Sequence, residues 1–193
     1  MHLDREIELL KAKTLSLAAR VEESLRNALK SVRDRDTDLG MKVIDGDEVI
    51  DQMEVALEEE CLKALALYQP VASDLRFIVA VIKVTGELER IGDLAVDIAE
   101  RGVYLTEHPP EPMPAQLANE ATKVQAMVKK TLDSFVNLDP DLAREVCRSD
   151  DEVDMLHKGM FEVVQKWMHE SPEKIEIWLP LLSALIVLRI LGR

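Results

Sequence analysis

The sequence has few of the residues that enzymes and nucleic-acid-binding proteins use. Aromatic residues make up only 4% of the 193 residues, which leaves little for a base-stacking platform. Lysine and arginine total 24 against 37 aspartate and glutamate residues, so the net charge of -13 repels a phosphate backbone. No glycine-rich phosphate loop, nucleophile elbow or Cys/His metal framework is present. We therefore expect neither an enzyme nor a protein that binds nucleic acid.

Cysteine and long apolar runs are scarce as well. Cys61 and Cys147 are far apart, which favours buried thiols in a reducing compartment over a disulfide framework. The first residues alternate in charge, so we expect no signal peptide and a cytoplasmic protein. The most apolar stretch, 175–191, contains a glutamate, a proline and an arginine and is shorter than the ~20 residues of a membrane span. It predicts a buried helix, with membranes reached only through partner proteins.

Apolar residues recur at spacings of three and four along the whole chain, and no segment alternates as a strand does. Breaks fall at polar turns and at prolines. Asp139 and Ser171 directly precede proline, a pattern typical of a capped helix start. The predicted helices span 3–34, 38–68, 71–106, 115–137, 140–170 and 173–193.

A proline-rich segment, residues 109–114, divides the chain into two similar halves. A shift of 103 residues aligns acidic and apolar positions of the first half with those of the second. The aligned pairs include Asp36 with Asp139, Asp47 with Asp150, Ile50 with Val153 and Asp51 with Asp154. We predict an all-α fold, a tandem pair of three-helix bundles over residues 1–108 and 115–193.

Two rows of acidic side chains are the candidate binding site. The row in helix 38–68 comprises Asp47, Asp51, Glu54 and Glu58, and the row in helix 71–106 comprises Glu89, Asp93 and Asp97. Like charges at these spacings repel, and residues 36–60 hold ten acids but one base. If the rows face each other, oxygens of Asp47, Asp51, Glu89 and Asp93 could converge on Mg²⁺, Mn²⁺, iron or Zn²⁺. From spacing alone, a solvated acidic face is the alternative.

Three residues near the second row have both structural and functional interpretations. Gly92 costs ~1 kcal/mol relative to alanine inside a helix, which fits close helix packing or the approach of a ligand. Arg90 has an acid three residues away on either side, and Arg76 follows Asp74 by two, so surface ion pairs are expected. Docking of a partner's acidic patch is the functional alternative for both arginines.

Two other classes of protein remain as alternatives. A carboxylate-bridged di-iron oxidase needs inward-facing Glu-x-x-His pairs from two helices, and Asp154-Met-Leu-His157 is a single imperfect copy. A purely structural interaction module would use its acids only for solubility. Trp167 and Trp178 are expected to pack in the core or at an interface.

Three segments carry a resemblance to a known family. Gln69-Pro-Val-Ala-Ser-Asp-Leu-Arg-Phe-Ile78, Leu88-Glu-Arg-Ile-Gly-Asp93 and Ile98-Ala-Glu100 resemble the PhoU family of phosphate-uptake regulators. The resemblance implies tandem three-helix bundles with Asp/Glu-x-x-x-Asp motifs that bind divalent or transition metals. In the first half these motifs fall on Asp47 to Asp51 and Glu89 to Asp93, and in the second half on Asp150 to Asp154.

The resemblance also implies a role and partners. It implies a non-catalytic negative regulator of phosphate uptake and of the phosphate-starvation response, with a homodimeric state. Its expected partners are the ATPase subunit of a phosphate ABC transporter and a membrane sensor histidine kinase. One departure lies in the second half, where Gly192 stands at the position of the family's glutamate, so by this resemblance the last helix is expected to be truncated. We therefore expect the second metal site to be weak or absent.

Overall fold

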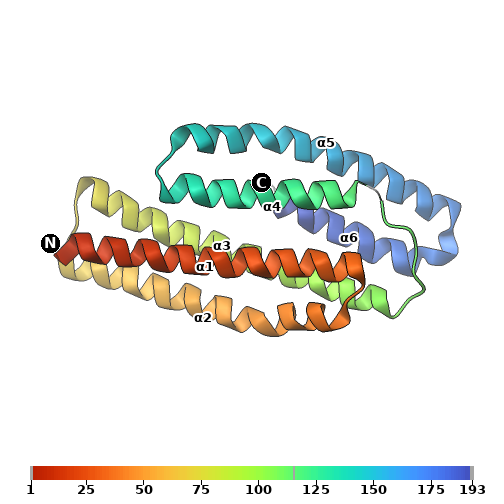
Figure 1. Ribbon diagram of the computed structural model, residues 1–193, viewed down its shortest axis with the longest axis horizontal. Helices are drawn as coiled ribbons and strands as arrows, with labels where there is room; N and C mark the ends of the chain where they lie inside the picture. Colours follow the sequence, from red (N-terminus) through yellow and green to blue (C-terminus); the bar gives the residue numbers. More distant parts are fainter. Residues whose placement is uncertain (1, 115, 192–193) are drawn as a thin grey trace.

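The protein is a bundle of long helices arranged in two groups of three (Figure 1). The structure, a computed structural model, describes residues 2–114 and 116–191. The helices are α1 (His2–Asp34), α2 (Thr37–Tyr68), α3 (Ala72–Thr106), α4 (Leu117–Val136), α5 (Pro140–Glu170) and α6 (Ile175–Leu191), with a 3-10 turn at Pro172–Lys174. This confirms the predicted all-α fold, and α1 to α5 agree with their predicted bounds to within two residues.

Side-chain caps define two of the helix starts. The Asp36 carboxylate accepts a hydrogen bond from the Leu39 main-chain N–H at 2.9 Å, and Asp139 accepts from two N–H groups at the start of α5. These bonds satisfy donors that a helix start leaves free. The predicted cap at Ser171 is wrong, because its side chain makes no capping bond and the 3-10 turn precedes α6.

The predicted internal repeat is visible in the positions of the helices. The first residues of α2 and α5, and those of α3 and α6, are both separated by 103 positions. Buried polar side chains repeat too. The Ser31 hydroxyl donates to the Ala28 carbonyl at 2.8 Å, and Ser134 donates to the Thr131 carbonyl at 2.7 Å. Both serines are buried near the ends of the first helix of their halves.

The two halves pack against each other along their length. Helix α1 contacts α4 and α3 contacts α6, so residues from both halves share the core. The Phe77 and Phe135 rings stack across this boundary with centroids 6.1 Å apart, and the Arg101 Nε donates to the Ser183 hydroxyl at 2.9 Å. A second apolar cluster, formed mainly by α5 and α6, includes Trp178. The Trp178 ring lies 5.1 Å from the Trp167 ring, as expected for tryptophans that pack in a core.

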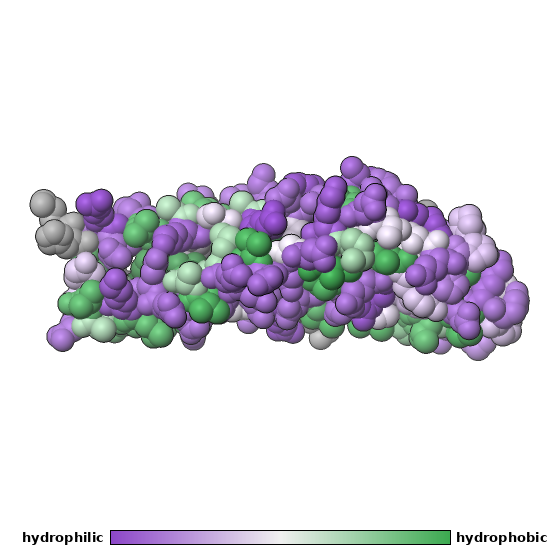
Figure 2. Space-filling view, turned by 90° about the horizontal axis from the view of Figure 1, so that it is seen from below, coloured by the Kyte–Doolittle hydropathy of each residue, from purple (hydrophilic) through white to green (hydrophobic). Residues whose placement is uncertain are grey.

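The structure corrects one expectation about the cysteines and refines one about helix α6. Cys61 is buried but Cys147 is exposed, so the prediction of two buried thiols is wrong for Cys147. Helix α6 buries one face, yet Leu179 and Ile186 are exposed. None of the described helices has the length and apolar character needed to cross a membrane. The face seen in Figure 2 is largely hydrophilic, with apolar residues in small scattered groups.

Candidate functional site

The acidic rows of α2 and α3 meet at a point of close helix contact. A β-carbon built on Gly92 of α3 would lie 3.2 Å from the Ile50 side chain and 3.4 Å from the Asp47 Oδ1 of α2. Gly92 and Ile50 are buried, so the missing side chain lets the two helices approach. The Asp47 carboxylate is thereby placed directly against α3. Gly92 was expected to allow either close helix packing or the approach of a ligand. The structure shows close helix packing, which also positions the Asp47 carboxylate.

The Asp47 carboxylate has no partner for one of its oxygens. Its Oδ1 is buried and makes no hydrogen bond within the described chain. Burial raises the pKa of Asp47, and the nearby negative charges of Asp51 and Asp93 raise it further. An unsatisfied buried carboxylate oxygen is costly, and a cation is one group that can satisfy it.

The neighbouring carboxylates interact with one another. Burial raises the pKa of Glu89, and the charges of Asp93, Asp51, Glu54 and Asp47 add to this shift. Burial likewise raises the pKa of Glu54, with Glu58 and Asp51 contributing. Because α2 charges act on an α3 carboxyl and Asp47 lies against Gly92, the two rows lie close together, an arrangement that the sequence left open. We name Asp47, Asp51, Glu89 and Asp93 the acidic site.

The acidic site is not a preformed metal centre. Within residues 2–114 and 116–191, no three carboxylate, imidazole or thiol groups are placed so as to hold one metal ion. Asp51 and Asp93 are exposed, which leaves their side chains room to change rotamer. Asp97, included among the predicted ligands, pairs instead with Arg101, whose Nη1 lies 2.8 Å from its Oδ1. Its carboxylate therefore already has a cationic partner.

The two arginines proposed as partner contacts are both exposed on α3. The Arg90 Nη1 lies 3.7 Å from the Glu87 Oε2, which is the expected surface pair. Arg76 does not pair with Asp74 as predicted. Its Nε instead donates to the Ala72 main-chain carbonyl at 3.2 Å. Docking of a partner through these arginines stays a prediction.

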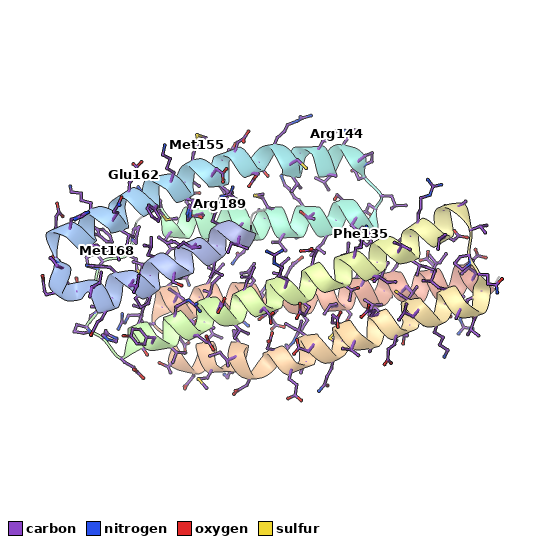
Figure 3. All side chains as sticks on the ribbon, turned by 180° about the vertical axis from the view of Figure 1, so that it is seen from behind. Phe135, Arg144, Met155, Glu162, Met168 and Arg189 are labelled. Atoms are coloured by element: carbon purple, nitrogen blue, oxygen red, sulfur yellow. The ribbon has the colours of Figure 1, made fainter. Side chains whose placement is uncertain are left out.

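In the second half, an arginine lies against the predicted metal motif. The Arg189 guanidinium of α6 is 3.2 Å from the Asp150 Oδ1 and also contacts Asp154, and both aspartates belong to α5. Figure 3 shows the Arg189 side chain among the helices of this half. The arginine supplies the positive charge that a metal ion would otherwise bring. The departure at Gly192 lies outside the described residues.

Arg189→Gln should therefore destabilise the protein by about 1.5 kcal/mol at pH 7, because two aspartates lose a charged hydrogen-bonding partner. Urea denaturation followed by circular dichroism measures this change. Arg144→Gln is the matched control, because Arg144 pairs with Asp141 in an exposed position of α5 (Figure 3) and such pairs contribute little. Equal effects of the two substitutions would contradict a special role for Arg189.

Sequence reasoning missed a buried acid. Glu120 of α4 is 0% exposed, neither of its carboxylate oxygens has a hydrogen-bond partner, and its Oε1 lies 3.5 Å from the His157 Nδ1. Burial raises the pKa of Glu120 to about 7, opposed by the charge of Arg189. Burial also lowers the pKa of His157. The internal repeat could have indicated this buried acid, because the shift of 103 residues aligns Glu120 with Leu17, which is buried in the core.

The fold and the site together define a class: an all-helical protein of two repeated three-helix units, with an acidic site between its second and third helices. Residues 14–102 and residues 117–192 each match the PhoU domain. The chain therefore belongs to the PhoU family, as the resemblance indicated.

Similar proteins agree with this assignment over most of the chain. The phosphate-specific transport system accessory protein PhoU homolog of Aquifex aeolicus is 35% identical, covering 91% of this chain and 80% of its own. The accessory protein PhoU of Escherichia coli is 32% identical over 88% of this chain and 70% of its own. The crystal structure of PhoU from Pseudomonas aeruginosa superposes with a TM-score of 0.94 at 35% identity, covering 98% of this chain and 91% of that one.

Proposed function

We propose that this chain is an accessory protein of phosphate uptake that acts by binding other proteins and not by catalysis. The observation that carries the proposal is the match of both halves to the PhoU domain, together with relatives named as accessory proteins of the phosphate-specific transport system. In this role it is a cytoplasmic negative regulator of phosphate uptake and of the phosphate-starvation response. Its partners are the transporter's ATPase subunit and a membrane sensor histidine kinase, and it acts as a homodimer.

The acidic site is proposed to bind divalent or transition metal ions. Two features support this: the buried Asp47 oxygen without a partner and the mutual repulsion that raises the pKa of Glu89. The donors are all carboxylate oxygens, which suits Mg²⁺ and Mn²⁺ and permits iron or Zn²⁺. A bound ion would supply positive charge that offsets the repulsion. Asp150 and Asp154 are proposed to bind an ion more weakly, because Arg189 competes with it.

Metal occupancy is proposed to control partner binding. Ionised carboxylates at an exposed site attract a basic partner surface, and an ion bound among them changes both their charge and their positions. If the partner and the ion each bind one arrangement of these side chains better, their affinities are coupled. Exposed Arg76 and Arg90 on α3 would contact acidic groups of the same partner.

Calorimetric titration of the isolated transporter ATPase subunit, and of the kinase's cytoplasmic region, tests the proposal. We expect saturable binding to both and an affinity that changes at least fivefold when Mn²⁺ is added, the lower end of typical coupling between sites. Asp47→Asn/Asp93→Asn should remove the dependence on Mn²⁺. Asp45→Asn/Glu48→Gln makes the same charge change at exposed positions of α2 and should preserve it.

The outcomes separate this proposal from its alternatives. Binding that is equally strong with and without Mn²⁺ would favour a structural interaction module whose acids only aid solubility. Oxygen-dependent oxidation of ferrous iron would favour a di-iron oxidase. Against that alternative, the buried Glu120 and the partly buried His157 come from different helices and do not form a Glu-x-x-His pair. Absence of binding to both partners would overturn the adaptor role itself.

A further inference from the structure

The two halves enclose a groove that has no part in the acidic site. Its volume is about 630 Å³, within the range of small-molecule sites. Helices α1 and α3 line it from the first half, α4 and α6 line it from the second, and Met113 and Pro114 of the linker complete it. Arg26 on one side and Ala118 on the other are exposed, so the groove opens between α1 and α4, which lie side by side in Figure 1.

The rim of this groove is basic in an otherwise acidic protein. Arg26, Lys30 and Arg33 follow one another on α1 at spacings of four and three, so they share one face of the helix. Arg33 is held by Asp34 through bonds of 2.7 and 3.0 Å. Within the described part of the chain, Arg26 and Lys30 form no salt bridge, and no acidic residue lines the groove. The Arg33 hydrogen bond lowers the pKa of the Asp34 carboxyl, and the nearby charge of Lys30 lowers it further. Among the described residues, Arg26 therefore supplies an unpaired cation at the rim and Lys30 a partly offset one.

The interior of the groove is mainly aliphatic. Leucine, isoleucine, valine and methionine side chains form it together with Ala121 and Ala184, and the polar side chains of Thr122 and Gln125 on α4 also belong to the lining. No aromatic ring belongs to the lining that the structure describes. Nucleobases usually stack on aromatic side chains, whereas a flexible hydrocarbon chain needs only apolar surface. The lining thus favours an aliphatic ligand over a nucleotide.

We propose that this groove binds a small amphiphilic anion, with its hydrocarbon chain among the helices and its carboxylate or phosphate head at Arg26 and Lys30. The proposal goes beyond the accessory role and does not depend on the acidic site. Both halves supply the walls, so a bound ligand contacts α1 and α3 as well as α4 and α6. Ligand binding should consequently raise the unfolding temperature of the whole protein.

Calorimetric titration with sodium decanoate below its micelle concentration tests the proposal. We expect saturable binding with one molecule per chain. Each methylene removed, from decanoate to nonanoate and octanoate, should weaken binding about fourfold because each buried methylene contributes ~0.8 kcal/mol. Decanol, which has the same chain without charge, should bind more weakly than decanoate.

Charge and shape are tested by separate variants. Arg26→Gln/Lys30→Gln should weaken decanoate binding about tenfold and leave decanol binding unchanged, because two charge contacts of up to ~1 kcal/mol each are lost. Lys42→Gln/Lys63→Gln makes the same charge change at exposed positions of α2 outside the groove and should have no effect. Ala118→Phe should narrow the groove and weaken decanoate and decanol alike, with the circular dichroism spectrum unchanged.

The remaining outcomes decide between sources of the anion. Decyl phosphate should bind like decanoate if the head group is recognised only by its charge. Binding to vesicles of anionic phospholipid without binding to monomeric decanoate would overturn the proposed ligand site in the groove and indicate membrane attachment. Binding of decanoate that the control variant weakens as much as Arg26→Gln/Lys30→Gln would also overturn it, since net charge alone would then explain the effect.

Discussion

Asp47→Asn is expected to stabilise the metal-free protein and to abolish its stabilisation by Mn²⁺. Without metal, ionised Asp47 is half-buried beside Asp51 and Asp93, so removing its charge should add about 0.5–1 kcal/mol to the free energy of unfolding. With Mn²⁺ at a hundred times its dissociation constant, the natural chain should gain about 2.7 kcal/mol. The variant loses most of this gain, so the substitution has opposite effects in the two conditions.

Thermal unfolding in EDTA and in excess Mn²⁺ measures both effects. A change of 1 kcal/mol corresponds to about 2–4 °C for a chain of this size. Asp45→Asn is the matched control, because Asp45 is an exposed acid of the same helix. If Asp45→Asn reproduces both effects of Asp47→Asn, the cause is net charge and the acidic site binds no specific ion.

The acidic rows of α2 and α3 also give the stability an expected pH dependence. The pKa values of Asp47, Glu54 and Glu89 are raised in the folded chain, so these groups bind protons more tightly when folded than when unfolded. Their favourable contribution is complete below their ordinary pKa values and is lost as the pH rises through the raised ones. A bound cation should reverse this trend, because it favours the ionised carboxylates.

The helices and the acidic row on each of α2 and α3 were predictable because each depends on periodicity along a single chain segment. Apolar residues every three or four positions specify a buried helical face, and the turn residues between them set the bounds. The rows follow from the same period, and Gly92 marks where α2 and α3 come closest. Short connections make α2 and α3 neighbours, whereas the approach of the two rows depends on how the helices are rotated and is seen only in the structure.

The contacts of the second half were not predictable, because they join side chains from separate helices. The spacing of Asp150 and Asp154 on α5 gives no information about the Arg189 guanidinium that reaches them from α6. Asp97 is a different case, since its partner Arg101 lies four residues later on the same helix, a spacing that the sequence shows. Spacing identifies carboxylates on one face, while their available charge depends on which cations lie nearby.

Glu120 shows what a comparison of the two halves adds to periodicity. Its position on α4 is that of buried Leu17 on α1, so a core position of the second half carries an acid. The Glu120 carboxyl has only a few polar groups near it. His157 and Asp154 come from α5 and Arg189 from α6, while the Glu120 carboxylate itself makes no hydrogen bond. Such a group keeps its proton to higher pH than an exposed glutamate.

Glu120→Gln is therefore expected to remove a large pH dependence of stability. The pKa of Glu120 rises from 4.5 to about 7 on folding, so its favourable contribution is present below pH 4.5 and is lost as the pH rises toward 7. The loss amounts to about 3 kcal/mol, at 1.36 kcal/mol for each pKa unit. At pH 8 the variant should be more stable than the natural chain by up to this amount.

His157 has the opposite dependence and must be separated from Glu120. Its pKa is lowered in the folded chain, so its contribution is lost as the pH falls through that lowered value. Because the His157 Nδ1 lies 3.5 Å from the Glu120 Oε1, the two titrations are coupled, so Glu120→Gln is compared with its parent chain both with His157 and with His157→Asn. Urea denaturation between pH 5 and pH 8 supplies these curves.

The control is Glu162→Gln, because Glu162 is exposed on α5 (Figure 3) and should give a curve parallel to that of the natural chain. Parallel curves for Glu120→Gln as well would show that the buried carboxyl titrates like an exposed one. A stability difference that instead widens with pH and levels off above pH 7 would establish that a core position of this fold holds an acid with a pKa raised to about 7, where the first half holds leucine.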